Sequence, residues 1–373
     1  MIYIDSQAAL EELCAVLEDE AEFAFDTEFI RENTFVPILC LMQVATQEEI
    51  YLIDCPRLDL TSFLKILSNQ KITKVMHSAS QDIDLFVKNY DLIPQPIFDA
   101  QIAASFLGYG SSISYAKLVR DVLKIRLNKA SKLTNWLNRP LSKAQKNYAA
   151  SDVKYLLEIK AKLSNKLTER ERLTWLNEEF AKLYELSNYY VAPQDAWQRI
   201  TQNSDTPFFL NYLQAYAAYR EELAVQKNLP RRFIIKDEYL VGLAKLKPQT
   251  QDDLASDRIL KKYIKPKYLE SLLKLSQEVA KQEIELEAPQ KSHLSDNNEM
   301  ICDLLKIYLK YIAKKYKIAA ANIAKSNDIK NFVLKSNDYS FAEGWRYEVF
   351  GQGAESILAG ELVPTIKDGR LEF

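Results

Sequence analysis

Glycine is scarce in this chain, with 8 in 373 residues, and neither G-x-x-x-x-G-K-[ST] nor G-x-G-x-x-G occurs. Both patterns wrap phosphates with a glycine-rich loop, so their absence argues against P-loop and Rossmann nucleotide binding. The chain also has only 2 histidines, and its 4 cysteines are far apart with no C-x-x-C: Cys14, Cys40, Cys55 and Cys302. A structural zinc site is therefore not expected.

Long apolar runs are missing as well. No run approaches the roughly 18 residues of a membrane span, and Met1 to Asp5 lack the basic start and apolar core of a signal peptide. We therefore expect a cytoplasmic protein with reduced thiols and no membrane association. What is present is ordinary globular composition, 47% hydrophobic and 27% charged. At roughly 100 to 200 residues per domain, the length predicts two or three domains.

The stretch F-A-F-D-T-E-F at residues 23–29 has the pattern of a short strand that ends in acidic residues. Because side chains alternate along a strand, Asp26 and Glu28 share one face. Two adjacent carboxylates on such an apolar strand repel each other unless a cation lies between them, and hard ions such as Mg²⁺ prefer oxygen ligands. Taken alone, the pair favours an ordinary polar strand end.

The segments around this strand indicate an α/β domain. Apolar runs at 38–45 and 50–54 predict two further strands that form an antiparallel meander with it. A helix near 61–67, a strand at 72–77 and a helix near 80–89 then alternate, which is typical of parallel strands with helices on the sheet faces. We predict a mixed sheet flanked by helices.

Two later segments carry acids that could join the pair. Asp82 falls in the first turn of a predicted helix, at the carboxyl end of a strand, where ligand sites of α/β sheets gather. The same place suits an ordinary acid at a helix N-terminus. Tyr148 and Asp152 lie one turn apart on a helix predicted from about 142 to beyond 163. Its apolar stripe would leave Asp152 in need of a partner or a metal, although the position also fits the margin of a core.

Together these residues resemble the signature of the DEDD exonuclease superfamily in its tyrosine-bearing branch: Asp26, Glu28, Asp82, Tyr148 and Asp152. Longer blocks in the same order resemble the ribonuclease D family. One departure is Asn135 before Trp136, where the family commonly has an acid. The blocks are F-D-T-E-F, T-F-V-P-I-L-C-L-M-Q, H-S-A-S-Q-D-I-D-L-F and N-R-P-L-S-K-A-Q-K-N-Y-A-A-S-D-V-K-Y-L.

The resemblance implies a ribonuclease H-like exonuclease fold and two divalent ions, Mg²⁺ or Mn²⁺, in one active site. By that analogy Asp26 bridges both ions, Glu28 and Asp152 complete the site of the water-binding ion, and Asp82 acts on the other. Tyr148 would orient the attacking water, because a phenol with a pKa near about 10 is a poor base at neutral pH. The products would be nucleoside 5′-monophosphates.

Basic residues between 117 and 146 greatly outnumber the single acid Asp121, which suits a phosphate backbone and also a solvated helical face. The candidates for RNA contact here are Lys132, Arg139 and Lys143, and Phe29 is a candidate for stacking on a base. Further along, the sequence is similar to the helicase and RNase D C-terminal (HRDC) domain. The candidates there are Lys261, Lys262 and Lys265.

We therefore predict an exonuclease domain at 1–190, an HRDC helical domain at 194–280 and a second C-terminal helical domain at 296–373. The predicted function is a 3′–5′ exoribonuclease that acts as a monomer on RNA, including tRNA precursors. One alternative is a DNA-directed 3′–5′ exonuclease, which the helical domains disfavour. Another is an inactive RNA-binding scaffold, which would leave the metal-binding acids and the tyrosine without a purpose.

Overall fold

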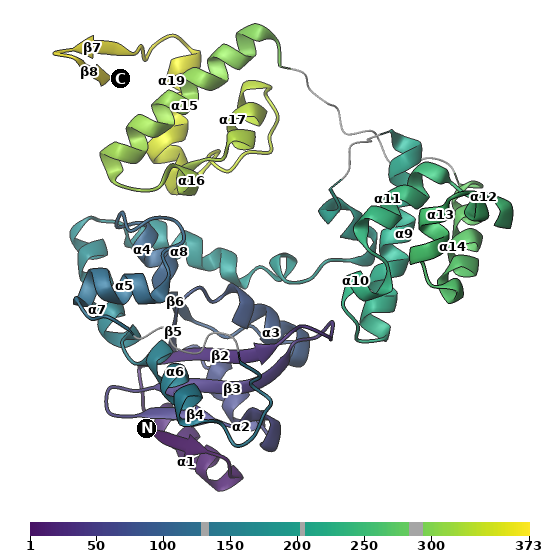
Figure 1. Ribbon diagram of the computed structural model, residues 1–373. Helices are drawn as coiled ribbons and strands as arrows, with labels where there is room; N and C mark the ends of the chain where they lie inside the picture. Colours follow the sequence, from purple (N-terminus) through teal and green to yellow (C-terminus); the bar gives the residue numbers. More distant parts are fainter. Residues whose placement is uncertain (128–133, 202–205, 283–293) are drawn as a thin grey trace. The chain divides into compact units, whose positions relative to one another are not determined.

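The computed structural model describes residues 1–127, 134–201, 206–282 and 294–373 (Figure 1). Lys132, a candidate for RNA contact, lies outside them. The chain forms two compact units. Unit 1 comprises Met1–Phe29, Leu39–Glu185 and Ser292–Phe373, and unit 2 comprises Ile30–Ile38 and Leu186–Lys291. The three predicted domain ranges remain a prediction. In the structure, the range 296–373 belongs to the same compact unit as the exonuclease residues.

The centre of unit 1 is a mixed six-stranded sheet in the order β1-β4-β3-β2-β5-β6. β3 and β4 pair antiparallel, while β1 and β4, β2 and β5, and β5 and β6 pair in parallel. The predicted α/β fold class is confirmed. The strands are β1 (Ile2–Ile4), β2 (Glu22–Ile30), β3 (Ile38–Ala45), β4 (Ile50–Ile53), β5 (Thr73–Met76) and β6 (Ile97–Asp99).

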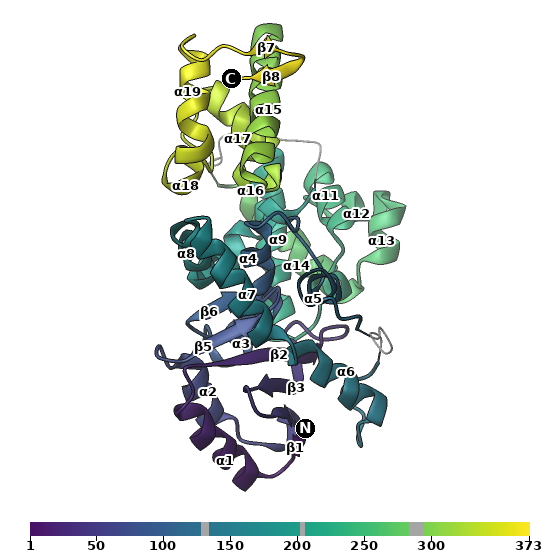
Figure 2. The same cartoon turned by 90° about the vertical axis from the view of Figure 1, so that its left-hand side faces the viewer.

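Helices cover both faces of this sheet. On one face, Phe25 of β2 packs its ring 6.0 Å from Phe63 of α2 and 5.8 Å from Phe86 of α3, all fully buried. In Figure 2, α1 and α2 lie on one side of the sheet and α6 on the other. The helices are α1 (Gln7–Glu18), α2 (Thr61–Ser68), α3 (Ser80–Tyr90), α4 (Ala100–Ser105), α5 (Tyr115–Leu123), α6 (Lys143–Val153), α7 (Leu156–Glu169) and α8 (Leu173–Ala181).

The single long helix predicted from about 142 is wrong, because the chain turns at Lys154 and Tyr155 between α6 and α7. The backbone N–H of Tyr155 donates to the hydroxyl of Tyr115 at 3.2 Å, a contact between segments 40 residues apart. This bond replaces one that a continuous helix would make. The break lies directly after the turn that carries Asp152.

The C-terminal part of unit 1 packs on α8 through Trp345, which is fully buried. Its ring stacks on Trp175 at 5.4 Å and meets the Phe106 ring edge-on at 5.0 Å, while Arg346 pairs with Glu179. This part contains α15 (Asp296–Tyr316), α16 (Ala320–Ile323), α17 (Ser326–Val333), α18 (Gly344–Arg346), a π-helical turn (Tyr347–Gly351), α19 (Gln352–Leu358), and a hairpin of β7 (Thr365–Lys367) and β8 (Arg370–Glu372).

Unit 2 is a helical bundle around Leu213, Tyr216 and Leu240. Residues 30–38 belong to it: Phe35 packs on the bundle, and the N–H of Val36 donates to Asn228 Oδ1 at 2.9 Å. No helix in the described ranges is both long and apolar enough to cross a membrane. The helices are α9 (Pro207–Gln226), α10 (Arg231–Ile234), α11 (Asp237–Leu246), α12 (Gln251–Ser256), α13 (Arg258–Tyr263) and α14 (Pro266–Val279).

Candidate active site

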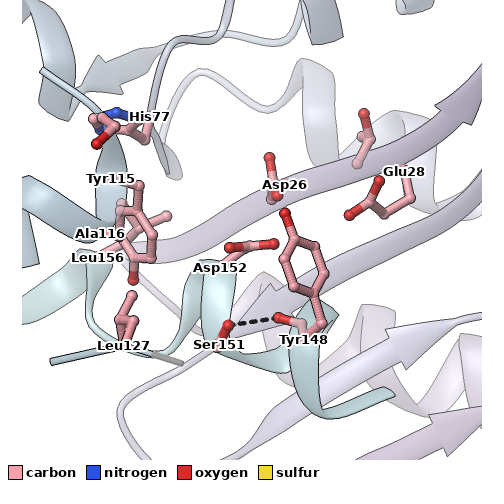
Figure 3. A pocket seen from close by; sticks show the side chains of 12 residues that line it. Asp26, Glu28, His77, Tyr115, Ala116, Leu127, Tyr148, Ser151, Asp152 and Leu156 are labelled. Carbon is pink, nitrogen blue, oxygen red and sulfur yellow. Dashed lines mark hydrogen bonds between the residues drawn. The ribbon is translucent and has the colours of Figure 1, made fainter. Parts of the chain in front are cut away.

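Strand β2 presents its two acids on the face opposite the phenylalanine core. Phe23 and Phe25 are fully buried against the helices on the other face, which leaves Asp26 and Glu28 to line a cavity of about 320 Å³ (Figure 3). The apolar half of the strand thus fixes the direction of its acidic half, because side chains alternate. Asp26 and Glu28 therefore lie on one face of the strand, as the sequence predicts.

Helix α6 brings Tyr148 and Asp152 to the same cavity. The helix starts with a capping box between Ser142 and Gln145, which sets its first turn and therefore the direction of the later ones. Tyr148 and Asp152 follow one turn apart, and Figure 3 shows both side chains directed toward Asp26. Residues far apart in sequence thus meet in one cavity.

Asp82 lies at the margin of this site. It is in the first turn of α3, is 6% exposed and accepts a hydrogen bond from the hydroxyl of Thr27. Thr27 lines the cavity between Asp26 and Glu28, whereas Asp82 does not. The structure therefore joins Asp82 to the other acids through the strand residue that separates them.

The acids concentrate negative charge out of water. Burial raises the pKa of Asp26 well above its usual range, and the charges of Asp82, Asp152 and Glu28 raise it further. The pKa of Glu28 is raised to about 8, first by burial and then by Asp152 and Asp82. Burial likewise raises the pKa of Asp82 to about 7. At neutral pH such a group of acids favours bound protons or a bound cation.

Divalent cations fit this donor set by its chemistry, since it offers oxygen ligands and uncompensated negative charge. Within the described parts of the chain, however, no three His, Cys, Asp or Glu side chains already stand at ligand spacing. The acids are close enough to shift one another's pKa.

Tyr148 is held as a neutral phenol. Its pKa is raised, first by burial and then by the charges of Asp152, Glu28 and Asp26. Its ring lies 6.1 Å from that of Trp136, which is 4% exposed. A protonated hydroxyl can donate and accept hydrogen bonds but cannot act as a base at neutral pH.

The other end of the cavity is aromatic and apolar, and our sequence reasoning did not identify it. The rings of His77 and Tyr115 lie 5.6 Å apart. His77 Nε2 bonds the carbonyl of Ile113 at 3.0 Å, while its buried Nδ1 has no hydrogen-bond partner among the described residues. His77 follows strand β5 within one of the quoted sequence blocks, and that position at a strand end was the available signal. The remaining lining residues at this end are Ser114, Ala116, Leu127 and Leu156.

The candidates for RNA contact in unit 1 have different surroundings. Lys143 is exposed at the first residue of α6, and Phe29 is half-buried near the end of β2. Arg139 is only 14% exposed, and its five N–H groups are engaged by Asp54 and by the carbonyls of Trp136, Asn138 and Cys40. Since no donor is left for a phosphate, the assignment of Arg139 to RNA contact is corrected.

In unit 2, two of the predicted lysines, Lys262 and Lys265, lie beside exposed aromatic residues. The ring of Tyr263, 53% exposed, stacks on Tyr239 at 5.3 Å with an interplanar angle of 7°. Lys262 Nζ lies 5.0 Å from the centre of the Tyr263 ring, and Lys265 Nζ lies 3.5 Å from the carbonyl oxygen of Phe233. We call this surface the basic-aromatic face; it comprises Lys261, Lys262, Tyr263, Lys265 and Phe233.

Comparison with known proteins agrees with both units. Residues 1–168 match the 3′-5′ exonuclease domain family, and residues 209–275 match the HRDC domain family. Ribonuclease D of Sphingobium indicum is 38% identical over 99% of this chain and 97% of its own length. Ribonuclease D of Bartonella henselae is also 38% identical, over 100% of this chain and 93% of its own.

A solved structure extends the likeness to the fold. The crystal structure of Escherichia coli RNase D, described as an exoribonuclease involved in structured RNA processing, superposes with a TM-score of 0.83. The alignment is 28% identical and covers 96% of this chain and 98% of that one. The likeness therefore spans both units, not the exonuclease domain alone.

Proposed function

Because the chain belongs to the ribonuclease D family and is a 3′–5′ exoribonuclease, we propose that its acidic cavity holds two divalent ions and that it trims the 3′ ends of tRNA precursors. The observation that carries the proposal is the convergence of half-buried acids from β2 and α6 on one cavity, with Tyr148 among them. We further propose that it acts as a monomer in the cytoplasm.

The proposed ligands are Asp26, Glu28, Asp82 and Asp152. Bound Mg²⁺ or Mn²⁺ would supply an activated water and neutralise charge on the departing 3′ oxygen. Asp26 is the central ligand of this proposal, because the charges of all three other acids raise its pKa. Asp82, set behind Thr27, would act at the margin of the site.

Tyr148 is proposed to orient the attacking water. Its raised pKa keeps the proton on the hydroxyl, so the group positions the water and does not deprotonate it. The other end of the cavity presents the rings of His77 and Tyr115, tilted by 58° to each other, against which the 3′-terminal nucleoside could pack. We propose that this end holds the residue being removed.

Contacts away from the cavity would hold the body of the RNA. The basic-aromatic face combines exposed ammonium groups with exposed rings, which suits a phosphate backbone and unpaired bases. We propose that Lys261, Lys262 and Lys265 bind RNA there, and that Lys143 and Phe29 do so near the cavity. Escherichia coli RNase D is described as acting in structured RNA processing, which supports a structured substrate for this chain.

The test is a nuclease assay on a tRNA carrying a 3′ extension, with Mg²⁺, Mn²⁺ or a chelator, against a DNA strand of matched sequence. We expect stepwise shortening of the RNA from its 3′ end with either metal and none with the chelator. Preferential degradation of the DNA strand would contradict the proposal. So would shortening that continues unchanged in the chelator.

A further inference from the structure

Asp54 is a fully buried carboxylate directly after strand β4, outside the acidic cavity. Asp54 accepts a hydrogen bond from the hydroxyl of Tyr3 at 2.9 Å. It accepts two more from Arg139, from Nε at 2.8 Å and from Nη2 at 2.5 Å. A buried charge needs such partners, and these also hold the ends of β1 and β4 together. The side chain of Arg57, which is 55% exposed, also pairs with this carboxylate, with Nε 3.4 Å from Asp54 Oδ2.

Arg139 uses its remaining donors on backbone carbonyls. Nη1 donates to Trp136 at 2.6 Å and to Asn138 at 3.1 Å, and Nη2 donates to Cys40 of β3 at 3.0 Å. One planar guanidinium therefore ties the segment before α6 to the sheet. A lysine ammonium has three donors and no planar fork, so it cannot reproduce these bonds.

The segment that Arg139 holds leads directly to Tyr148. Trp136, whose carbonyl Arg139 binds, is buried with its ring 6.1 Å from the Tyr148 ring. The amide of Gln145 donates to the Thr134 hydroxyl at 3.0 Å, so the same segment also sets the first turn of α6. The contacts run without a break from Asp54 through Arg139 and Trp136 to Tyr148.

We propose that Arg139, anchored by Asp54, is a positioning residue that holds Trp136 and α6 so that Tyr148 lies correctly in the cavity. The inference rests on the proposed role of Tyr148. It assigns to the reaction a residue that touches neither RNA nor the reacting atoms. A misplacement of about 1 Å at a reacting group can lower a rate by about 100-fold.

The experiment compares single-turnover rates and RNA dissociation constants of the full chain with those of Arg139→Lys. We expect the rate to fall at least about tenfold while Kd stays unchanged, because the residue acts on the geometry of the cavity. Arg57→Gln is the matched control, since Arg57 pairs with the same Asp54 but has no hydrogen bond or ion pair with residues 134–142; its rate should equal that of the wild type. A circular-dichroism melt shows that each variant is folded.

The second arm combines Arg139→Lys with Tyr148→Phe. If Arg139 acts through Tyr148, adding Arg139→Lys to the Tyr148→Phe chain lowers its rate by less than about threefold, because the group being positioned is already gone. A full loss in both backgrounds would overturn the inference. So would a wild-type rate for folded Arg139→Lys, or a loss confined to Kd, which would return Arg139 to RNA contact.

Failure of the proposed function has a separate signature. If Tyr148→Phe alone keeps the wild-type rate, the role of Tyr148 is refuted. Hydrogen exchange of peptides covering 134–152 then decides the inference on α6. Faster exchange there in Arg139→Lys, together with a reduced rate, retains Arg139 as a positioning residue for the helix that carries Asp152. Unchanged exchange overturns it.

Discussion

The acidic cavity of unit 1 and the basic-aromatic face of unit 2 carry charge in opposite ways. In the cavity, half-buried and buried carboxyl groups raise one another's pKa, so at neutral pH they keep protons unless a cation replaces them. On the face, lysines stand exposed beside exposed rings. The first arrangement is costly in isolation and suits chemistry on a bound ion. The second is stable in isolation and suits reversible binding of a polyanion.

The largest effect should come from removing one charge from the cavity. We expect Asp26→Asn and Asp152→Asn each to lower the rate of RNA hydrolysis by more than about 1,000-fold, with RNA affinity nearly unchanged. Single-turnover assays with Mg²⁺ measure the rate. Glu158→Gln, on the exposed surface of α7, is the control and should keep full activity. A rate near wild type for either Asp variant would remove that residue from the proposed ligand set.

A smaller loss of hydrolysis rate is expected from a change at Tyr148, the neutral phenol in the cavity. Tyr148→Phe removes one hydroxyl without removing charge, and positioning contributes less than generating the nucleophile, so we expect a rate about 10- to 100-fold lower. The pH dependence of the rate should keep its shape, because the raised pKa of Tyr148 lies beyond the working range. A shifted basic limb in the Tyr148→Phe profile would instead mean that the phenol titrates during the reaction.

The charge strain in the cavity should appear as a stability change with pH. The pKa of Glu28 is about 8 in the folded chain, against 4.5 for a glutamate in an unfolded chain. Between these values the folded state keeps a proton that the unfolded state has lost, so stability falls as pH rises through this window. In a chelator at pH 9, Glu28→Gln should therefore be more stable than the wild type, by up to about 5 kcal/mol.

Urea unfolding in the chelator at pH 5 and pH 9 provides that measurement, and the two chains should converge at pH 5. Mg²⁺ should restore stability to the wild type more than to the variant, since a ligand stabilises the state that binds it. Equal stability of the two chains at pH 9 would mean that the cavity is not strained by its own charge.

The smallest effect should come from the basic-aromatic face. Replacing Lys261, Lys262 and Lys265 together by Gln should weaken tRNA binding by about tenfold and flatten the log-log salt dependence by about 1 for each lysine on a phosphate. Hydrolysis of a short unstructured RNA should not change. Lys274→Gln, whose ammonium is paired with Glu270, is the control. An unchanged salt slope in the triple variant would exclude the face from RNA binding.

The sequence predicted the cavity through the resemblance of its ordered blocks to the ribonuclease D family, whereas strand and helix periodicity alone left ordinary structural roles open for these acids. Asp26, Glu28, Tyr148 and Asp152 could therefore be expected to meet before any coordinates were known. The α/β class followed from the alternation of short strands and helices, and the pairing of β3 with β4 confirmed the expected antiparallel step.

The remaining features depend on partners distant in sequence. Arg139 looked like a phosphate ligand because its neighbours are basic, while its partner Asp54 stands 85 residues earlier. At the break after α6, the N–H of Tyr155 bonds to Tyr115, which stands 40 residues earlier. The packing of Trp345 on Trp175 joins residues 292–373 to unit 1. A fragment ending near residue 186 would lose that cover, so it is a poor test of what the exonuclease residues do alone.

The most direct test of the account is titration calorimetry of the full chain with Mn²⁺ at pH 8, without RNA, for the wild type and Asp26→Asn. If the acids of the cavity form the catalytic cation site, the wild type should bind Mn²⁺ with release of protons from carboxyls whose pKa is raised. Asp26→Asn should lose that binding. Equal Mn²⁺ affinity and stoichiometry in the two chains would contradict the account.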